Sequence, residues 1–428
     1  MMEKITETRL DSGIVVLTDR MPGVRSATLG FFFRTGSRHE PDHLNGITHF
    51  IEHCVFKGSS ARSALEIANE QDRLGGNLEA FTTHEETGFV VKVVDDEFEN
   101  AFSLLADMTI SPRLDEADLI NERRVIVEEM KMNEDSPDEV LGDIFHREFF
   151  PGHPLGLSIT GTPGSVQTFD SATARAFHRH AFSPANLIIA AAGNVEHELL
   201  IGSLESAEWF PNIEQYDLRS SIDAPRFGSP VVIEPRQDLE QAHIIIATPT
   251  VSARDPRRYA ADLLADILGG GTSSRLWQRV REERGLTYSI GASTAMFLDC
   301  GYMAVAAATS PEQAGEVVDI VLEEIASIVR EGVNRTELDL MKDQTRASIL
   351  LSLEDSAGRA ASLAQCEMIH GRQIPIEETL ENLAAVSLDD VRSIADEFFR
   401  ADRVALIALG DLNESEFTKE RVFSPFQH

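Results

Sequence analysis

An internal repeat constrains the fold of this 428-residue chain more than any other feature of its sequence. A phenylalanine, a short polar turn, an apolar strand-like run and a glycine occur in that order at 182–193 and again at 399–410. The two copies are 217 residues apart, and the sequence Glu-Asp-Ser recurs at 134–136 and 354–356 with an offset of 220. Periods of this length indicate a duplicated domain rather than a solenoid, whose repeats are much shorter.

Each copy mixes short strand patterns with longer helical ones. Strands are predicted at 13–18, 27–34, 77–83 and 89–94. Ser63 and Glu66 have the spacing of a capping box at a helix start, and Asp255-Pro256 predicts a helix with Asp255 as its cap. Strands joined by hairpin-like turns and followed by runs of helix favour an α+β arrangement.

We therefore predict an α+β fold of two homologous domains, each a mainly antiparallel sheet packed with helices. The first domain is expected at 1–215 and the second at 236–428. A linker is expected at 216–235, because much of the sequence before Pro235 is polar and irregular.

The strongest chemical signal lies in the first copy, where His49, Glu52 and His53 fall within five residues. Residues four apart share a face of a helix, so His49 and His53 can bind one metal ion. Glu52 can reach the same cavity without being a ligand. In metallohydrolases of this kind the metal acidifies a water molecule, and a carboxylate takes its proton as the water attacks a carbonyl. The order H-x-x-E-H is the inverzincin signature, although two histidines at this spacing also occur on ordinary solvated helices.

A catalytic zinc site usually has three protein ligands, so a third donor is expected elsewhere in the chain. Residues 116–135 form an unbroken run of helix formers in which Glu122 and Glu129 are seven apart and share a face. On such a helix the side chain of Glu128 is turned about a hundred degrees away from that of Glu129, so Glu128 is expected on the surface. Spacing alone does not distinguish Glu122 from Glu129 as the third ligand.

The second copy lacks the residues of this metal motif. At the offset of 220, Lys342 stands where the first copy has Glu122, and Ile349 stands where it has Glu129. The helix expected to end near 262–271, in the place of the metal helix, contains no histidine. The second copy is therefore expected to have kept the fold and lost the zinc chemistry.

Taken together, the motifs resemble those of the pitrilysin-type (M16) zinc peptidases, within which the chain is most similar to the short-chain branch containing mitochondrial processing peptidase and its bacterial relatives. The similar segments span essentially the whole chain and include His49-Phe50-Ile51-Glu52-His53, Phe56-Lys57-Gly58, Gly75-Gly76, Ala80-Phe81-Thr82 and Glu122-Arg123. The resemblance implies that His49, His53 and Glu129 bind one zinc ion per chain. It further implies that Glu52 is the general base and that Glu122 orients one of the ligands.

The same resemblance implies residues for substrate binding. Arg281 and Tyr288 match a pair, seven residues apart, that holds the substrate backbone and stabilises the tetrahedral oxyanion, so both are catalytic and substrate-binding candidates. Ala80 is a further substrate-binding candidate. The chain departs from the family pattern at Glu79, where Asn is usual, so the polar lining near the metal is expected to differ. Without the resemblance, Tyr288 would be predicted to be half-buried.

The resemblance also bears on assembly, because a short chain supplies half of the clamshell seen in the long family members. It implies a homodimer, or a heterodimer with a homologue. Long members carry the metal motif in their first quarter and the Arg/Tyr pair in their last. A dimer is therefore expected to combine the zinc site of one subunit with Arg281 and Tyr288 of the other.

Composition limits the partners and the compartment. The chain has 71 acidic and 38 basic residues, and its net charge of −33 disfavours nucleic acid and favours neutral or basic peptides. No stretch has the apolar length needed to span a membrane, and the first residues lack the apolar core of a signal peptide. Three scattered cysteines, Cys54, Cys300 and Cys366, form no disulfide or metal pattern. We expect a soluble cytoplasmic protein that binds neither nucleic acid nor a membrane.

The leading hypothesis is a zinc endopeptidase that uses a metal-activated water to hydrolyse extended peptides or unstructured segments inside an enclosed chamber. One alternative is a non-catalytic or regulatory subunit of a complex similar to processing peptidase, for which an eroded metal motif is expected. Another is a metal-dependent hydrolase of a non-peptide substrate, which a peptide-cleavage assay would distinguish.

Overall fold

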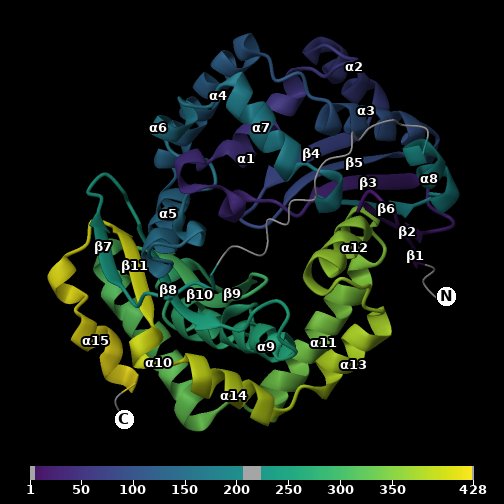
Figure 1. The fold of residues 1–428 in the computed structure, drawn as a ribbon. Coiled ribbons are helices and arrows are strands. Elements are labelled where there is room, and N and C mark those ends of the chain that lie inside the picture. The colour runs from purple at the N-terminus through teal and green to yellow at the C-terminus, as the bar shows by residue number, and fades with distance from the viewer. Residues whose placement is uncertain (1–4, 206–222, 427–428) are drawn as a thin grey trace. The chain divides into compact units, whose positions relative to one another are not determined.

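A computed structural model of the chain describes residues 5–205 and 223–426. Contacts divide these residues into two compact units, and each unit contains one β-sheet with helices on both faces (Figure 1). Unit 1 takes its described residues from Met1–Met132, Leu157–Asp223 and Leu350–Gln373. Unit 2 takes them from Asn133–Gly156, Ala224–Ile349 and Ile374–His428.

The sheet of unit 1 has six strands in the order β1-β2-β6-β3-β5-β4. The strands are β1 (Ile5–Arg9), β2 (Val15–Arg20), β3 (Ser26–Phe33), β4 (Asn77–Thr82), β5 (Thr87–Val94) and β6 (Leu187–Gly193). The pair β2 and β6 is parallel, and the other neighbouring pairs are antiparallel.

The sheet of unit 2 repeats this plan with five strands in the order β7-β11-β8-β10-β9. The strands are β7 (Val231–Pro235), β8 (Ala242–Thr250), β9 (Thr287–Met296), β10 (Gly301–Thr309) and β11 (Ala405–Gly410). The pair β7 and β11 is parallel, like the pair β2 and β6 of unit 1, and the other neighbouring pairs are antiparallel. The order therefore matches β2-β6-β3-β5-β4 of unit 1. The same strand order and directions confirm the predicted α+β class and the duplication.

Helices cover both sheets. The longer helices of unit 1 are α1 (Ile47–Cys54), α2 (Ala64–Leu74), α3 (Phe98–Ile110), α4 (Glu116–Glu134), α7 (Ser171–Ala181), α8 (His197–Glu205) and α12 (Ser356–His370), with the short α6 (Pro163–Val166). Those of unit 2 are α5 (Pro137–Phe149), α9 (Arg258–Gly269), α10 (Ala314–Glu331), α11 (Arg335–Ser352), α13 (Ile376–Ala385), α14 (Leu388–Phe398) and α15 (Lys419–Phe423). Within the described ranges, none of the helices has the length and apolar character that crossing a membrane requires.

The repeated glycine of the sequence ends the same strand in both copies. Strand β6 is buried along its whole length because helices cover both of its faces, which explains its unbroken apolar run. At its end Gly193 has a φ of 115°, and a Cβ atom there would lie 2.2 Å from the carbonyl oxygen of Ser26. Gly410 ends β11 with a φ of 152°, and a Cβ atom there would lie 2.9 Å from Cα of Ala242. Both positions therefore require glycine.

The two copies exchange a helix. Helix α12 comes from the second half of the sequence but packs on the sheet of unit 1, where Leu363, Ala364 and Met368 contact apolar residues of β2, β3 and β6 (Figure 1). The buried Glu367 of α12 accepts hydrogen bonds from Arg34 at 2.7 Å and from both terminal nitrogens of Arg9. Conversely, α5 comes from the first half and packs on β8 and β11 of unit 2. Each exchanged helix begins at the end of one copy of the Glu-Asp-Ser sequence, α5 one residue after its serine and α12 at its serine.

The structure differs from the predicted boundaries in two places. Residues 133–156 were predicted in the first domain but belong to unit 2. Residues 350–373 were predicted in the second domain but belong to unit 1. Part of the predicted linker, 216–222, lies outside the described residues, whereas Val231–Pro235 are not linker but the strand β7, which pairs with β11.

The predicted helix start at Asp255 is also wrong, because α9 begins at Arg258. The carboxylate of Asp255 accepts hydrogen bonds from the backbone and the guanidinium of Arg257, which closes a turn before the helix. By contrast, the predicted capping box of Ser63 and Glu66 is present at the start of α2.

Candidate active site

The site is built on α1, a short helix fixed by its core contacts and by a carboxylate from outside the helix. Ile47, Phe50 and Ile51 are fully buried. The residue that precedes the helix, Gly46, has a φ of 93° and no side chain with which to cap it. The buried Glu40 supplies the missing acceptor: the N–H groups of Gly46 and Thr48 donate to its two carboxylate oxygens at 2.7 and 2.8 Å. Burial nevertheless raises the pKa of Glu40 to about 7.

The three predicted metal ligands converge. His49 and His53 of α1 and Glu129 of α4 each present a potential ligand atom, and these atoms lie within 4.8 Å of one another. Nε2 of His49 is 3.7 Å from one oxygen of Glu129, and Nε2 of His53 is 3.5 Å from the other. The two distances exceed those of strong hydrogen bonds, so the groups face a common point without binding one another closely.

This arrangement fits a zinc ion. Ligand atoms at about 2.0–2.2 Å from a tetrahedral zinc lie roughly 3.3–3.6 Å apart, close to the separations between Glu129 and the two histidines. Oε2 of Glu129 is buried and has no hydrogen-bond partner in the described parts of the chain, a costly state that a cation would relieve. Burial, and after it the charge of His53, lowers the pKa of His49 to about 4, so His49 is neutral as a metal ligand must be.

Glu122 lies behind His53 rather than among the ligand atoms. Its Oε1 is 3.0 Å from Nδ1 of His53, and its Oε2 pairs with Nζ of Lys57 at 2.8 Å. Burial raises the pKa of Glu122, but the bonds to His53 and Lys57 outweigh it and hold the pKa below its ordinary value. An ionised Glu122 bound to Nδ1 orients the ring so that Nε2 faces Glu129. Glu128 is exposed, as predicted.

Glu52 lies near enough to His53 and Glu129 to interact with their charges. It is buried in α1, and the hydroxyl of Thr82 on β4 donates to its Oε2 at 2.8 Å. Burial raises the pKa of Glu52, and this effect exceeds the opposing influence of the Thr82 bond. A carboxylate whose pKa is raised towards neutrality is better suited to general-base catalysis than an ordinary surface glutamate.

Strand β4 forms an edge of the sheet next to this site. It pairs with β5 on one side, and the other side carries no strand in the described residues. Side chains alternate along a strand, so Ala80 lies on the same face as Thr82 and packs towards the core. Glu79 lies on the opposite face, is exposed and accepts a hydrogen bond from Asn77. The departure from the family pattern therefore does not alter the face of β4 that holds Glu52.

Arg281 and Tyr288 come together in unit 2. The guanidinium carbon of Arg281 lies 4.9 Å from the centre of the Tyr288 ring. Tyr288 is 80% exposed, so it is not half-buried as its sequence alone suggested. Arg281 lies on a π-helical segment, Trp277–Glu282, and its guanidinium also lies 4.1 Å from the centre of the Trp277 ring.

Several residues of these two sites had no predicted role. Glu40 is nine residues before His49 and Thr82 is thirty after Glu52, so no helical or strand period links them to the motif. Lys57 belongs to one of the segments that resemble the family, and Trp277 is close to Arg281 in the sequence. Neither sequence pattern predicted the contact of Lys57 with Glu122 or that of Trp277 with Arg281. A buried acidic residue near a glycine-capped helix is a signal that could have identified Glu40.

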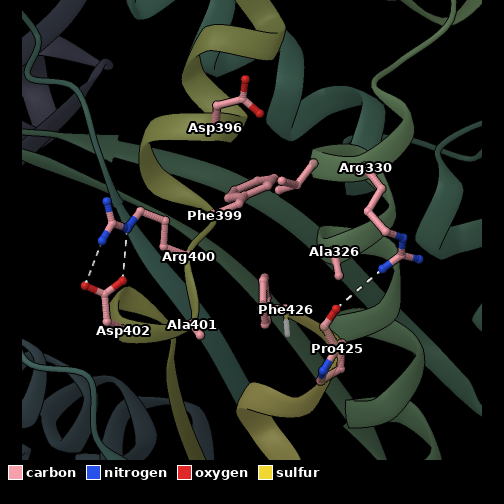
Figure 2. Close-up of a pocket in the computed structure, with 10 residues that line it drawn as sticks. Ala326, Arg330, Asp396, Phe399, Arg400, Ala401, Asp402, Pro425 and Phe426 are labelled. Carbon is pink, nitrogen blue, oxygen red and sulfur yellow. Dashed lines mark hydrogen bonds and ion pairs between the residues drawn. The ribbon is translucent and has the colours of Figure 1, made fainter. Parts of the chain in front are cut away.

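A cavity of about 480 Å³ in unit 2 contains none of the predicted site residues (Figure 2). It is lined by residues of α10, the end of α14 and the C-terminal segment. Arg400 and Asp402 pair across its wall, and Arg330 donates to the carbonyl of Pro425 at 3.4 Å (Figure 2). The cavity therefore has no connection to the chemistry of the two sites.

Replacing the cap of α1 should loosen the metal helix. Glu40→Ala leaves the N–H groups of Gly46 and Thr48 buried without an acceptor, which costs about 1–2 kcal/mol. We expect amide hydrogen exchange in residues 46–54 to become about tenfold faster in the metal-free protein. Glu66→Ala, which removes the capping box of α2, is the matched control and should leave exchange in 46–54 unchanged. Unaltered exchange after Glu40→Ala would show that the cap contributes nothing to α1.

Comparisons with known proteins match this chain to two family models and to several relatives. Residues 15–163 match the family model described as insulinase (peptidase family M16), and residues 168–345 match that of the peptidase M16 inactive domain. An uncharacterized zinc protease of Streptomyces coelicolor is 35% identical over 421 residues, which cover 97% of this chain and 91% of that protein. An uncharacterized zinc protease of Bacillus subtilis is 33% identical over 398 residues, which cover 93% and 96%.

Solved structures show the same fold. A protease from Helicobacter pylori has a TM-score of 0.87 at 20% identity, covering 95% of this chain and 99% of that one. The peptidase M16 inactive domain from Pseudomonas fluorescens has a TM-score of 0.86 at 18% identity, covering 95% and 98%. At these identities the similarity concerns the fold alone.

Proposed function

This chain belongs to peptidase family M16, and we propose that it is a zinc-dependent endopeptidase that hydrolyses extended peptides. One observation carries the proposal: His49, His53 and Glu129 converge on one point, and Glu52 is held beside them by Thr82. The ligand set of two histidines and one glutamate is that of a catalytic zinc site, which keeps a position open. We propose one zinc ion per chain.

The reaction assigns distinct tasks to the residues of the chain. When bound, zinc would polarise the scissile carbonyl and lower the pKa of a water molecule. Glu52 takes a proton from the attacking water and delivers it to the leaving amine nitrogen. Because Thr82 donates to Oε2, the other oxygen, Oε1, is left to carry that proton. Glu122 holds Nδ1 of His53 and so keeps Nε2 directed at the metal position.

Peptide binding is best supported at the free edge of β4. An edge strand presents unpaired N–H and C=O groups to which an extended peptide can add as a further strand. Such a peptide would pass Ala80 and Thr82, and Thr82 contacts the proposed base. The net charge of −33 would favour basic peptides among the candidates.

A peptide blocked at both ends tests whether the activity is that of an endopeptidase. We expect an internally quenched peptide with an acetylated N-terminus and an amidated C-terminus to be cleaved, because the proposed site requires no free terminus. A non-peptide hydrolase or a non-catalytic subunit would leave it intact. Cleavage confined to peptides with a free N-terminus would replace this proposal with an aminopeptidase.

We further propose a dimer in which the zinc site of one subunit works with Arg281 and Tyr288 of the other, the two together enclosing the substrate. The resemblance to long family members supports this, since they carry the two motifs at opposite ends of the chain. The proposal also agrees with the placement of the two motifs in different compact units. A homologous partner chain in place of a second copy would provide the same combination.

Mixing two inactive variants tests the sharing of residues between subunits. Glu52→Gln lacks the base and Tyr288→Phe lacks the phenol, but a heterodimer of the two retains one complete site. With free exchange of equal amounts, half of the dimers are heterodimers, so about a quarter of the wild-type sites should be restored. The measurement is the peptidase rate of the mixture against that of each variant alone.

The matched control is a mixture of Glu52→Gln with His49→Ala. Both changes affect the metal-binding half, so no heterodimer has a complete site and the rate should stay at background. An unrestored rate in the first mixture, with subunit exchange demonstrated by mass spectrometry, would show that Arg281 and Tyr288 do not act in the partner's site.

A further inference from the structure

Arg281 differs from the neighbouring arginines of residues 275–284 in the kind of side chain that it contacts. Arg275 pairs with Glu337 at 2.7 Å, Arg279 pairs with Glu324, and Arg284 pairs with Glu316 at 2.7 Å. The guanidinium of Arg281 makes no ion pair or hydrogen bond with any described residue. It lies instead against two aromatic rings, 4.1 Å from the centre of Trp277 and 4.9 Å from the centre of Tyr288.

This arrangement keeps the donors of Arg281 free. A carboxylate partner would occupy the N–H groups of a guanidinium, usually two at a time. An aromatic face attracts the cation through the ring electrons and fixes its plane, but it accepts none of the in-plane N–H groups. In a chain with 71 acidic and 38 basic residues, an arginine without an acidic partner is held in a state ready for an external acceptor.

Trp277 is itself fixed. Its indole N–H donates to Glu282 at 3.1 Å, across the turn of the π-helical segment Trp277–Glu282. This bond joins the first and last residues of the segment and places the indole face beneath Arg281. The π-helical geometry, which is rare and commonly marks functional positions, thus brings Trp277, Arg281 and Glu282 into one contact group.

We propose that Trp277 is a positioning residue for substrate binding, holding the guanidinium of Arg281 flat while leaving its donors free for a peptide carbonyl or the developing oxyanion. This inference rests on the proposed peptidase function. Tyr288 also contacts the cation but is 80% exposed, so the closer indole, which is hydrogen-bonded to Glu282, is the main support. Glu282 acts one step further away by fixing the indole.

Kinetics of a double-mutant cycle test the inference. Trp277→Leu keeps an apolar side chain but removes the aromatic face, and it should lower kcat about tenfold with zinc content unchanged. In the Arg281→Gln background the same change should cost less than about twofold, because there is no cation left to position. Trp277→Phe retains a ring and should keep at least about a third of the wild-type kcat.

The matched control removes a comparable stacked pair elsewhere in unit 2. Arg258 lies 4.4 Å from the centre of the Tyr259 ring on α9, and Tyr259→Leu should leave kcat unchanged. An equal loss from Trp277→Leu with and without Arg281 would overturn the inference, because the tryptophan would then act independently of the arginine. No loss from Trp277→Leu would overturn it as well.

A spectroscopic measurement separates failure of this inference from failure of the proposed function. The chain has two tryptophans, so Trp209→Phe leaves Trp277 as its sole indole emitter. Arg281→Gln in that background should shift the emission maximum, because the charge against the ring is removed, whether or not the protein cleaves peptides. An unchanged spectrum would overturn the stacking, whereas a shifted spectrum in a protein without peptidase activity would refute only the function.

Discussion

Glu52→Gln should lower kcat by roughly two to four orders of magnitude while leaving zinc and fold in place, the range associated with loss of a general acid–base group. Glutamine has nearly the shape of glutamate and its side-chain oxygen can still accept the hydrogen bond of Thr82. It cannot take a proton from water. Because His49, His53 and Glu129 are unchanged, metal content should stay at the wild-type value. Peptidase rates at saturating substrate, with zinc measured on the same samples, check this result.

The control for that variant is Glu128→Gln. Glu128 lies beside Glu129 in sequence, but its side chain is 69% exposed and pairs with Lys131. The same chemical change there should leave kcat within about twofold of wild type, because exposed ion pairs contribute little. Substantial zinc-dependent hydrolysis by Glu52→Gln would mean that another group removes the proton.

Glu129→Ala should reduce zinc affinity far more than Glu122→Ala. Glu129 offers its oxygens to the point that Nε2 of His49 and Nε2 of His53 also face, so its removal takes away a proposed ligand. Glu122 contacts the far nitrogen of His53, and the loss of such an outer contact typically costs about 10- to 100-fold in metal affinity. Competition with a chromophoric chelator measures both affinities.

The order of the two effects decides between the two glutamates. If Glu122→Ala lost the metal while Glu129→Ala bound zinc with native affinity, Glu122 would be the third ligand. Glu128→Ala again serves as the control on the same helix and should bind zinc like the wild type. Folding of each variant is checked by amide exchange in α4.

The sequence predicted the elements of the site better than their mutual arrangement. The i, i+4 spacing of His49 and His53 was sufficient to place both on one face of α1, because that relation is local to a helix. The choice between Glu122 and Glu129 was not local. Both lie on one face of α4, and what separates them is which nitrogen of His53 each approaches, a matter of tertiary packing.

The exchange of α5 and α12 shows a second limit. Helical periodicity identifies an apolar face but carries no information on which sheet that face will cover. The two Glu-Asp-Ser sequences marked equivalent positions at the starts of these helices, yet each helix packs in the unit opposite to the one its place in the sequence suggested. The contacts of the buried Glu367 with Arg9 and Arg34 join residues more than 300 positions apart, which no local pattern could reveal.

The contacts that support the site could not be predicted either, because they too join residues that no local sequence pattern relates. The bonds from Gly46 and Thr48 to Glu40 depend on a loop that folds back over the start of α1, not on a repeating pattern.

At α9, the pattern of Asp255 followed by proline suggested a helix cap. The carboxylate of Asp255 bonds to Arg257 instead, and the helix begins later, at Arg258. Short polar side chains choose among several local partners, so helix ends are less predictable than helix interiors.

Digestion of a mixed peptide library by the purified protein, with the products identified by mass spectrometry, shows whether the chain is a zinc-dependent endopeptidase. We predict cuts within peptides by a protein that holds one zinc per chain, loss of all cuts after chelation, and their return when zinc is added back. If the protein carries zinc at this ratio but cuts no peptide in the library, or if its cuts persist in full after complete removal of the metal, it is not a zinc-dependent endopeptidase.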